Sequence, residues 1–543
     1  MRALVAVFLT SLTVAALPAA GQQLPASAYG EAVFVVSGRG WGHGVGMSQY
    51  GAYGQARIGR TYDQILGHYY SDTTIGKAGR KEVRVLLAEG RQAVTVSSTA
   101  PFLATDAAGT TFELAKGAVT LRSDLALPSA DGTGPKRAKS PLVLRPGTKK
   151  AVLALDGKAY RGKIELVPQG GYLRVVNVSP LESYLQGVVA GEVPYTWPAE
   201  VLKAQAVAAR SYALANLVKG KPYDLYSDVR SQVYLGVAGE KPSTTQAVTD
   251  TAGEVVLYAG KVATTYYFST SGGRTASAAD VFGFDVPYLQ SRPDPWDKAS
   301  PHHRWGPTLL GARTVQAKLG AEARVFDATG MPTPSGRLRS LVLQTTSGPQ
   351  TVPATLVRTA LGLRSTWITF GVIRLDRPAS GTVTFGSTAR LTGVARLLGT
   401  PRIGSSADGS TWTDGTEVTF DKNGVVTADV KPTRATRYRL QAEGAASTAL
   451  LIQVAPKVQL LRPTLAEPTT IRGTVRPRVA GAMVTVERRK GTGWVVVGDA
   501  TVDATGAFSV PLDVAAPAGA YRARVAETAG YTAAISPVLQ VPR

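Results

Sequence analysis

The chain has 543 residues, which is too long for one ordinary hydrophobic core, so we expect two to four domains. Hydrophobic residues make up 44% and charged residues 18%, proportions that exclude a disordered or a membrane-embedded protein. The net charge of +22 favours contact with polyanions, and the absence of Cys excludes disulfides, thiolate metal sites and Cys nucleophiles.

The first residues are typical of a signal peptide. Met1 and Arg2 precede an apolar run at residues 3–17, which is too short for a membrane anchor. Small residues follow, and cleavage is expected after Gly21 or Ala28; a buried N-terminal helix is the alternative. No later stretch reaches the roughly 18 apolar residues of a membrane span. We therefore expect a signal peptide at 1–28 and a secreted, extracytoplasmic mature protein that does not span a membrane.

The positive charge is spread along the chain. Residues 374–543 hold 21 Lys and Arg against 13 Asp and Glu, and the rest of the surplus lies before them. For an exported protein the nearest polyanions are anionic polymers of the cell wall. Charge that only keeps the protein soluble is the alternative. Nucleic acid is not an expected partner, because there is no basic helix and no aromatic RNA-binding signature.

Residues 31–77 are rich in Gly and aromatic residues, with Gly at every second position from Gly38 to Gly46. An extended chain would have one bare face and one face carrying Trp41 and His43, which could contact a sugar. A bare face admits another backbone or a polymer ligand at close range. A structural turn is the alternative. The segment lacks the Gly-Lys-Ser/Thr of a P-loop.

Polar residues then indicate where helices begin. Ser48 or Thr61 could cap a following helix, and Gln64 would complete a capping box with Thr61. Further on, residues 82–175 predict short strands, residues 178–219 predict helices, and residues 223–373 predict mixed structure with helical segments near 314–319 and 352–361.

The first predicted helix of residues 178–219 has clear boundaries. Ser179 is the expected N-cap, Pro180 the first helical residue, and Glu182 completes a capping box, so Glu182 is interpreted as structural. Gly191 and Pro194 are expected to end the helix. Its apolar face is supplied by Tyr184, Leu185, Val188 and Val189.

Glu192 is expected just beyond this helix end. The helix macrodipole is negative there, so the pKa of the carboxyl group should be raised, as a general acid requires near neutral pH. An ordinary surface Glu in a loop is the alternative interpretation.

The second predicted helix covers residues 198–216, with Thr196 as its candidate cap. Its many Ala residues allow close packing against neighbours. Lys203 fits a surface charge, whereas Gln205 and Arg210 fit a polar site or a buried network.

After Ile373 the sequence changes to strands and turns, and a repeat appears with an offset of 82–83 residues. The repeated residues are Trp412, Asp421, Gly424 and Tyr438, which match Trp494, Asp503, Gly506 and Tyr521. The spacing fits two β-sandwich modules of immunoglobulin-like size, at 374–456 and 457–543, with a role in spacing or wall adhesion.

Three long motifs carry a resemblance to a known family. The first is Trp-Gly-His-Gly-Val-Gly-Met-Ser-Gln at 41–49, with Ile-Leu-Gly-His-Tyr-Tyr at 65–70. The second lies within 176–194 and continues as Leu-Lys-Ala-Gln-Ala-Val-Ala-Ala-Arg-Ser-Tyr at 202–212. The third is Ser-Gln-Val-Tyr at 231–234, followed by Ser-Gly-Gly at 271–273. Together they closely resemble the SpoIID/LytB family, over roughly residues 31–373.

The order of the motifs departs from the family. Its Trp-Gly-His-Gly segment usually closes the domain, whereas here it opens it, which resembles a circular permutation. Such a rearrangement is tolerated when the two ends of a domain lie close together. We therefore predict that the strand at 32–36 lies beside the segment at 367–373, and that the active site survives.

The resemblance implies an α+β SpoIID-like domain at 29–373, followed by the two all-β immunoglobulin-like modules. It implies a lytic transglycosylase that cleaves peptidoglycan glycan strands, with Glu192 as the catalytic acid and a 1,6-anhydro sugar as product. One carboxylate suffices, because the muramoyl C6 hydroxyl attacks, whereas a hydrolase usually needs two. The residues expected to contact the glycan are Trp41, His43, Ser48, Gln49, Lys203, Gln205, Arg210, Gln232, Tyr234 and Ser271.

A non-catalytic wall-binding protein, or an enhancer of a separate cell-wall amidase, is the second hypothesis, because LytB-type relatives have that role. Some relatives carry a zinc site that involves Cys. This chain has no Cys and four His, so we expect no metal and no cofactor. The adjacent His302 and His303 are interpreted as loop residues.

Overall fold

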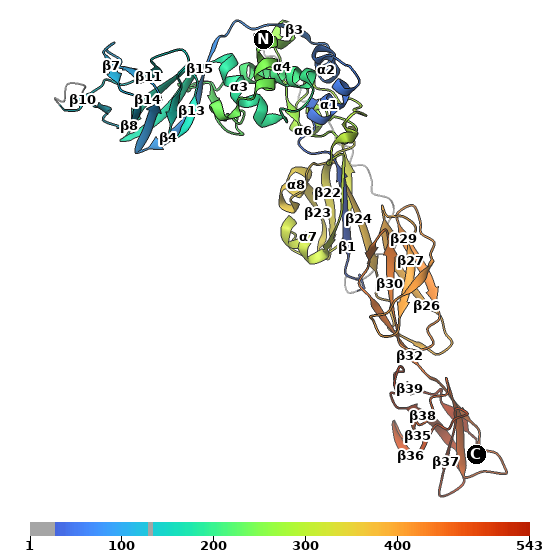
Figure 1. The fold of residues 1–543 in the computed structure, drawn as a ribbon. Coiled ribbons are helices and arrows are strands. Elements are labelled where there is room, and N and C mark those ends of the chain that lie inside the picture. Colours follow the sequence, from blue (N-terminus) through green and yellow to red (C-terminus); the bar gives the residue numbers. More distant parts are fainter. Residues whose placement is uncertain (1–27, 129–133, 543) are drawn as a thin grey trace, which may run out of the picture.

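The computed structural model describes residues 28–128 and 134–542, so residues 1–27 of the expected signal peptide lie outside it. The molecule is extended and bent (Figure 1). A β-lobe (residues 82–180) adjoins a helical lobe (40–81 and 181–303), a connecting lobe (29–39 and 304–375) follows, and two β-modules (376–455 and 456–542) complete the chain. In the part that the structure describes, no helix is long and apolar enough to cross a membrane.

The β-lobe is built from two sheets packed over one apolar core. The larger sheet has the order β16-β4-β15-β14-β11-β6-β7 and the smaller one β13-β12-β5-β8. Their strands are β4 (Glu82–Arg91), β5 (Ala93–Ser98), β6 (Phe102–Thr105), β7 (Thr111–Leu114), β8 (Gly117–Arg122), β11 (Leu142–Pro146), β12 (Leu153–Leu155), β13 (Lys158–Tyr160), β14 (Lys163–Gln169), β15 (Tyr172–Pro180) and β16 (Leu225–Tyr226). A short ribbon pairs β9 (Ala126–Leu127) with β10 (Lys136–Arg137).

The helical lobe is organised around one buried helix, α4 (Ala199–Ala215). One side of α4 packs into the β-lobe core through residues such as Leu202 and Ala206, and the other side packs against α1 and α2 through residues such as Ala204 and Val207. Small side chains on both sides allow this close packing, as the sequence indicates. The other helices are α1 (Gln49–Arg57), α2 (Tyr62–Tyr69), α3 (Leu181–Glu192), α5 (Pro242–Asp250) and α6 (Ala278–Phe282).

Two small sheets complete the helical lobe. One has the order β18-β17-β3, from β3 (Thr74–Lys77), β17 (Glu254–Tyr258) and β18 (Lys261–Val262). In the other, β2 (Met47–Ser48) runs parallel to β19 (Tyr267–Phe268). This pairing joins the Gly-rich motif to residues more than 200 positions later in the chain.

The connecting lobe confirms the predicted contact between the two ends of the domain. β1 (Val33–Arg39) lies between β20 (Arg304–Gly311) and β24 (Ile368–Leu375), with Val33 opposite Ile373. Apolar side chains of β1 share a core with the remaining elements of the lobe: α7 (Ala312–Leu319), β21 (Val325–Pro332), β22 (Leu338–Thr345), β23 (Gly348–Pro353) and α8 (Ala354–Leu361). Both helices lie where the sequence predicts them.

The expected boundary after Ile373 falls inside β24. The sheet has the order β20-β1-β24-β26-β29, so it continues from the connecting lobe into the first module without interruption. Val35 and Ile373 also share a hydrophobic core with Leu391 and Tyr438 of that module. The module therefore packs directly on the closure of the preceding domain.

The two β-modules have different sheet orders. Besides the shared sheet, the first module has a sheet with the order β25-β32-β30-β27-β28, and β31 also pairs with β30. The second module has two sheets, with the orders β33-β34-β37 and β36-β35-β38-β39. In the latter, β40 also pairs with β38. The first module comprises β25 (Thr382–Thr384), β26 (Ala389–Arg396), β27 (Arg402–Ser406), β28 (Thr413–Glu417), β29 (Val425–Val430), β30 (Thr436–Ala442), β31 (Ala445–Ala446) and β32 (Leu450–Ala455). The second comprises β33 (Lys457–Leu461), β34 (Thr470–Arg476), β35 (Met483–Lys490), β36 (Gly493–Thr501), β37 (Ala507–Pro511), β38 (Gly519–Val525), β39 (Ala534–Ile535) and β40 (Leu539–Val541).

The sequence repeat corresponds to repeated contacts in the two modules. The guanidinium of Arg439 lies 4.0 Å from the ring centroid of Trp412, and that of Arg522 lies 4.2 Å from Trp494. Asp421 and Asp503 each accept backbone N–H groups two and four residues later. The repeated residues therefore form the same turn and the same cation–π pair.

The helix starts are predicted only in part. Ser48 caps α1, where its Oγ accepts from the N–H of Gly51 at 3.1 Å, and Gln64 accepts from the backbone of Thr61 as expected. In contrast, Ser179 and Pro180 belong to strand β15, and α3 begins at Leu181. The predicted capping box is wrong there, because Ser179 completes the sheet and Glu182 turns toward Arg210. Helix α4 begins after Pro198, without a side-chain cap from Thr196.

We predict that Phe34→Ala destabilises the connecting lobe by about 3–5 kcal/mol. Phe34 is fully buried in β1 and its ring centroid lies 5.2 Å from that of Phe370, so the substitution leaves a cavity at the domain closure. Urea unfolding followed by intrinsic fluorescence tests this, with the exposed Phe420→Ala as control. Equal destabilisation by both substitutions would contradict the conclusion that packing of β1 stabilises the connecting lobe.

Candidate active site

Glu192 is the last residue of α3, whereas the sequence analysis places it just beyond the helix end. Gly191 is accommodated within the final turn. The helix ends because Pro194 biases the preceding Val193 toward an extended backbone, with φ −134° and ψ 150°. The carboxylate is therefore positioned by a rigid helix and not by a loop.

The pKa of Glu192 is raised, as expected, but its main cause is different. Burial is the largest influence, because a carboxylate loses solvation when it is removed from water. A hydrogen bond with the Tyr267 side chain opposes the shift by stabilising the charged form. The structure therefore adds burial of the side chain to the helix-end position that the sequence predicts.

Tyr267 belongs to a chain of hydrogen bonds behind Glu192. The amide Nε2 of Gln232 donates to the Tyr267 hydroxyl oxygen at 2.9 Å, and Tyr184 donates to Oε1 of Gln232 at 3.1 Å. Because the Tyr267 oxygen accepts from Gln232, its own proton is available to Glu192. Burial and the charge of Glu192 raise the pKa of Tyr267 far above its ordinary value, so Tyr267 remains a donor.

The Gly-rich motif holds the backbone on which Tyr267 lies. Gly40, Gly42, Gly44 and Gly46 all have positive φ, so this segment is not the extended strand considered from sequence. A Cβ on Gly46 would lie 2.1 Å from the Tyr266 carbonyl oxygen. The glycines therefore admit another backbone at close range, which is one of the two roles considered for them.

His43 connects this motif directly to Tyr267. Its Nδ1 accepts from the N–H of Val45 at 3.1 Å, so Nε2 carries the proton and donates to the carbonyl of Tyr267 at 3.1 Å. Burial, followed by the charge of Arg337, lowers the pKa of His43 to about 4. His43 is thus a neutral residue that fixes the strand bearing Tyr267.

Among the expected contact residues, Trp41 has an exposed side chain and Lys203 a partly exposed one. Trp41 is 45% exposed and its ring lies edge-on to His302, with centroids 4.3 Å apart. Lys203 lies on α4 and pairs with Glu200 at 3.0 Å. Trp41 is therefore available for contact with a ligand, whereas the ammonium group of Lys203 is engaged by Glu200.

The remaining expected contact residues are buried: Ser48, Gln49, Gln205, Arg210, Gln232, Tyr234 and Ser271. Gln49 donates to Gln205 at 3.4 Å, and Nε2 of Gln205 has no partner in the described structure. Tyr234 donates to Asn177 at 3.0 Å. These contacts support the site from within the protein.

Arg210 resolves one of the alternatives left open by the sequence. It is fully buried, donates to both carboxylate oxygens of Glu182, and donates to the carbonyl of Glu254 at 3.0 Å. It thereby joins α3, α4 and β17. The buried network is the interpretation that the structure supports, and Glu182 is its structural partner.

Ser271 belongs to a second buried network. Its Oγ donates to Asp297 at 2.9 Å, the N–H of Gly272 donates to the same carboxylate, and His303 Nδ1 lies 2.7 Å from its other oxygen. His302 and His303 lie outside the helices and strands, as predicted. This network holds the Ser-Gly-Gly turn that follows β19.

Half-buried aromatic rings lie near the end of α3. The ring centroid of Tyr212 lies 6.2 Å from that of Tyr267 and 5.8 Å from that of Tyr266, and the charge of Glu192 contributes to a raised pKa of Tyr212. Trp197, near the end of α3, packs against Tyr50 with centroids 5.0 Å apart. Aromatic faces beside one buried acid suit a carbohydrate substrate.

Sequence reasoning missed Tyr267 and Tyr212. Tyr212 closes the second motif, and Tyr266-Tyr267 precedes the Ser-Gly-Gly motif by a few residues, so their positions beside the motifs were the available signal. Their contact with Glu192 joins segments 20 and 75 residues apart, which no local pattern specifies.

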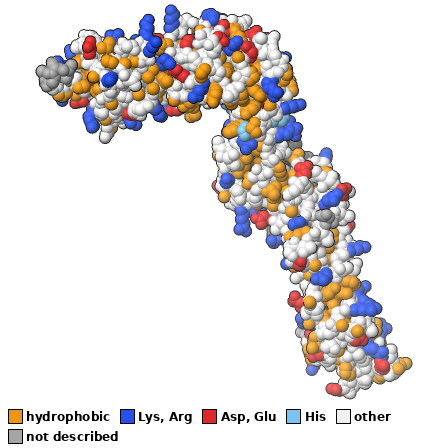
Figure 2. All heavy atoms as spheres, viewed as in Figure 1, with side chains coloured by type: hydrophobic (Ala, Val, Ile, Leu, Met, Phe, Trp, Pro, Cys, Tyr) orange, Lys and Arg blue, Asp and Glu red, His pale blue; other side chains and the backbone are white. Residues whose placement is uncertain are grey.

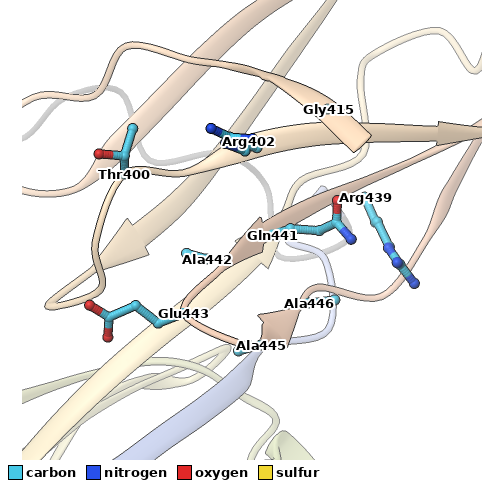
Figure 3. Close-up of a pocket in the computed structure, with 10 residues that line it drawn as sticks. Thr400, Arg402, Gly415, Arg439, Gln441, Ala442, Glu443, Ala445 and Ala446 are labelled. Carbon is cyan, nitrogen blue, oxygen red and sulfur yellow. The ribbon is translucent and has the colours of Figure 1, made fainter. Parts of the chain in front are cut away.

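A separate hollow lies on the first module (Figure 3). It has a volume of about 480 Å³ and is lined by residues that include Arg402, Arg439, Gln441 and Glu443. Arg402 pairs with Glu417 at 2.9 Å and Arg439 stacks on Trp412. Because both cations have structural partners, we assign this hollow no catalytic role.

Comparison with known proteins supports the resemblance that the motifs indicate. Residues 169–258 match the model of stage II sporulation protein, SpoIID, a segment that includes Glu192, α3 and α4. The stage II sporulation protein D of Bacillus subtilis is 33% identical over 206 residues, which cover 34% of this chain and 59% of that protein. Over this segment the chain is similar to SpoIID proteins, and the matches support the resemblance to the SpoIID/LytB family.

Other relatives agree with this result. An uncharacterized protein of Brachyspira hyodysenteriae is 33% identical over 216 residues (37% of this chain, 59% of that protein). The amidase enhancer of Bacillus subtilis is 37% identical over 159 residues (29% of this chain, 21% of that protein). The chain thus spans less than two thirds of the length of these relatives. A solved titin substructure aligns with 30% of this chain and 94% of its own, at 16% identity and a TM-score of 0.16.

We predict that Glu192→Gln stabilises the protein increasingly as pH rises. The folded pKa of Glu192 lies above its unfolded value of about 4.3, so native stability is fully present below that value and is lost as pH rises through the folded pKa. Gln does not ionise, so its variant does not lose stability in this way as pH rises. Urea unfolding at about pH 4 and about pH 8 measures the difference. The exposed Glu113→Gln is the control, and a difference independent of pH would refute the effect.

Proposed function

We propose that this protein is an exported peptidoglycan lytic transglycosylase, with Glu192 as its single acid and base. The observation that carries the proposal is the environment of Glu192. Among the described residues, burial and the Tyr267 hydrogen bond are the influences on its pKa, with no second carboxylate among them. A hydrolase usually combines two carboxylates, so a solitary half-buried acid favours a reaction that needs one.

The chemistry follows from the position of one proton. Protonated Glu192 donates its proton to the glycosidic oxygen between MurNAc and GlcNAc, and that bond breaks. The C6 hydroxyl of the same MurNAc attacks C1, and the Glu192 carboxylate accepts its proton. The product is 1,6-anhydroMurNAc, no water is consumed, and Glu192 returns to its protonated form. The raised pKa of Glu192 favours that form at the start of the cycle.

The other parts of the chain support work at the cell wall. Trp41 and the rings around Glu192 provide surfaces for sugar stacking. Lys and Arg side chains are distributed over the whole visible face (Figure 2), and this positive charge suits anionic wall polymers. We propose that the two β-modules are immunoglobulin-like spacers or wall-binding units, and that residues 1–28 direct export.

A non-catalytic role is the second candidate. The segment that is similar to the amidase enhancer of Bacillus subtilis favours it, because that relative is named for its effect on another enzyme. Under this alternative the chain binds glycan strands beside a cell-wall amidase. The pKa of Glu192 would then have no catalytic use.

We expect the purified protein to convert glycan strands without stem peptides into anhydromuramoyl products, and Glu192→Gln to lower turnover by at least about 100-fold. Mass spectrometry of the products measures both. Intact strands that nevertheless bind the wild-type protein would support the enhancer role instead. Glu113→Gln, far from the site in an exposed strand, should digest the strands as the wild type does.

We expect Tyr267→Phe to move the high-pH limb of the rate profile to higher pH. Its hydroxyl stabilises the charged form of Glu192, so its removal raises the pKa of that group further. The pH dependence of kcat on denuded strands tests this, with Tyr172→Phe, 46% exposed, as the control. If the high-pH decline of kcat stayed at the same pH, ionisation of Glu192 would not be its cause.

A further inference from the structure

A basic groove lies where the β-lobe meets the helical lobe. It has a volume of about 430 Å³ and is formed where β11 ends, β14 begins and α3 begins. Its lining includes Arg145, Lys149, Arg161 and Lys163, together with Gly147 and Ser183, and among the described residues no acidic side chain lines it. Four cations therefore line one hollow.

Three of these cations are available to a ligand. Arg161 is committed to Glu240, whose Oε1 lies 2.6 Å from its Nε. Arg145, Lys149 and Lys163 are exposed, and across residues 28–128 and 134–542 they form no ion pair. Like charges gathered in a hollow raise the local potential and attract anions.

The groove is separate from the candidate active site. Ser183 lines the groove and Glu192 ends the same helix nine residues later. At 3.6 residues per turn, the two side chains point to opposite sides of α3, about 13 Å apart along its axis. The groove therefore faces away from the scissile bond and suits a ligand other than the strand being cut.

We propose that this groove holds a phosphodiester-linked polyanion of the cell envelope and so tethers the protein to the wall. Each exposed cation binds one anion weakly, so a ligand gains affinity only by engaging several cations together. A polymer with a phosphate in every repeat does this, whereas a short peptide end offers few charges. Arg and Lys both suit phosphate oxygens. The proposal rests on the proposed extracytoplasmic location, but not on catalysis by Glu192.

The test measures binding of poly(glycerol phosphate) to the full chain at several salt concentrations. The groove variant is Arg145→Gln with Lys149→Gln and Lys163→Gln. The control variant removes three exposed charges elsewhere on the β-lobe, as Lys116→Gln with Arg122→Gln and Lys158→Gln. Unchanged circular dichroism and thermal midpoints establish that both variants fold.

We expect the groove variant to lose affinity by about tenfold to a hundredfold and to show a weaker salt dependence, because fewer counterions are released. The control variant should lose much less. Equal losses in both variants, no loss in either, or equal binding of poly-glutamate of the same length would overturn the proposal. Cleavage of glycan strands without stem peptides is assayed in parallel. If only Glu192→Gln loses cleavage and only the groove variant loses polyanion binding, the two proposals are tested independently of each other.

Discussion

The candidate active site depends on the close contact between the Gly-rich segment and residues 266–270, which include strand β19. Met47 and Ser48 pair with Tyr267 and Phe268, and His43 donates to the Tyr267 carbonyl. Side chains at Gly40 or Gly46 would overlap that strand. Because Tyr267 contacts Glu192, the position of the acid is linked through one tyrosine to a segment about 150 residues earlier in the chain.

The same segment also explains the architecture of the connecting lobe. In a chain that begins the domain with this motif, β1 must reach the strand that leaves the domain, and it does so between β20 and β24. The sheet then extends into the first module through β26. The closure of the domain and the attachment of the β-modules are therefore one structural feature.

Much of this arrangement is predictable from the sequence, and the exceptions have physical causes. The pairing of β1 with β24, helices α7 and α8, and the Ser48 cap follow from motifs and local patterns. The cap at Ser179 does not, because a long-range sheet claims that residue. The buried position of Arg210 and Ser271 is a second exception, because sequence alone does not distinguish a buried polar network from an exposed site.

Burial of Glu192 has opposite effects on stability and on the proposed chemistry. An acid whose pKa is raised by desolvation weakens the folded state when it is ionised. The surrounding residues limit this cost without removing it, because Tyr267 supplies one hydrogen bond to the carboxylate and is itself held by Gln232. Full neutralisation by a neighbouring cation would lower the pKa and abolish the protonated form. A buried acid supported by a neutral phenol therefore combines a defined position with a proton that can still be donated.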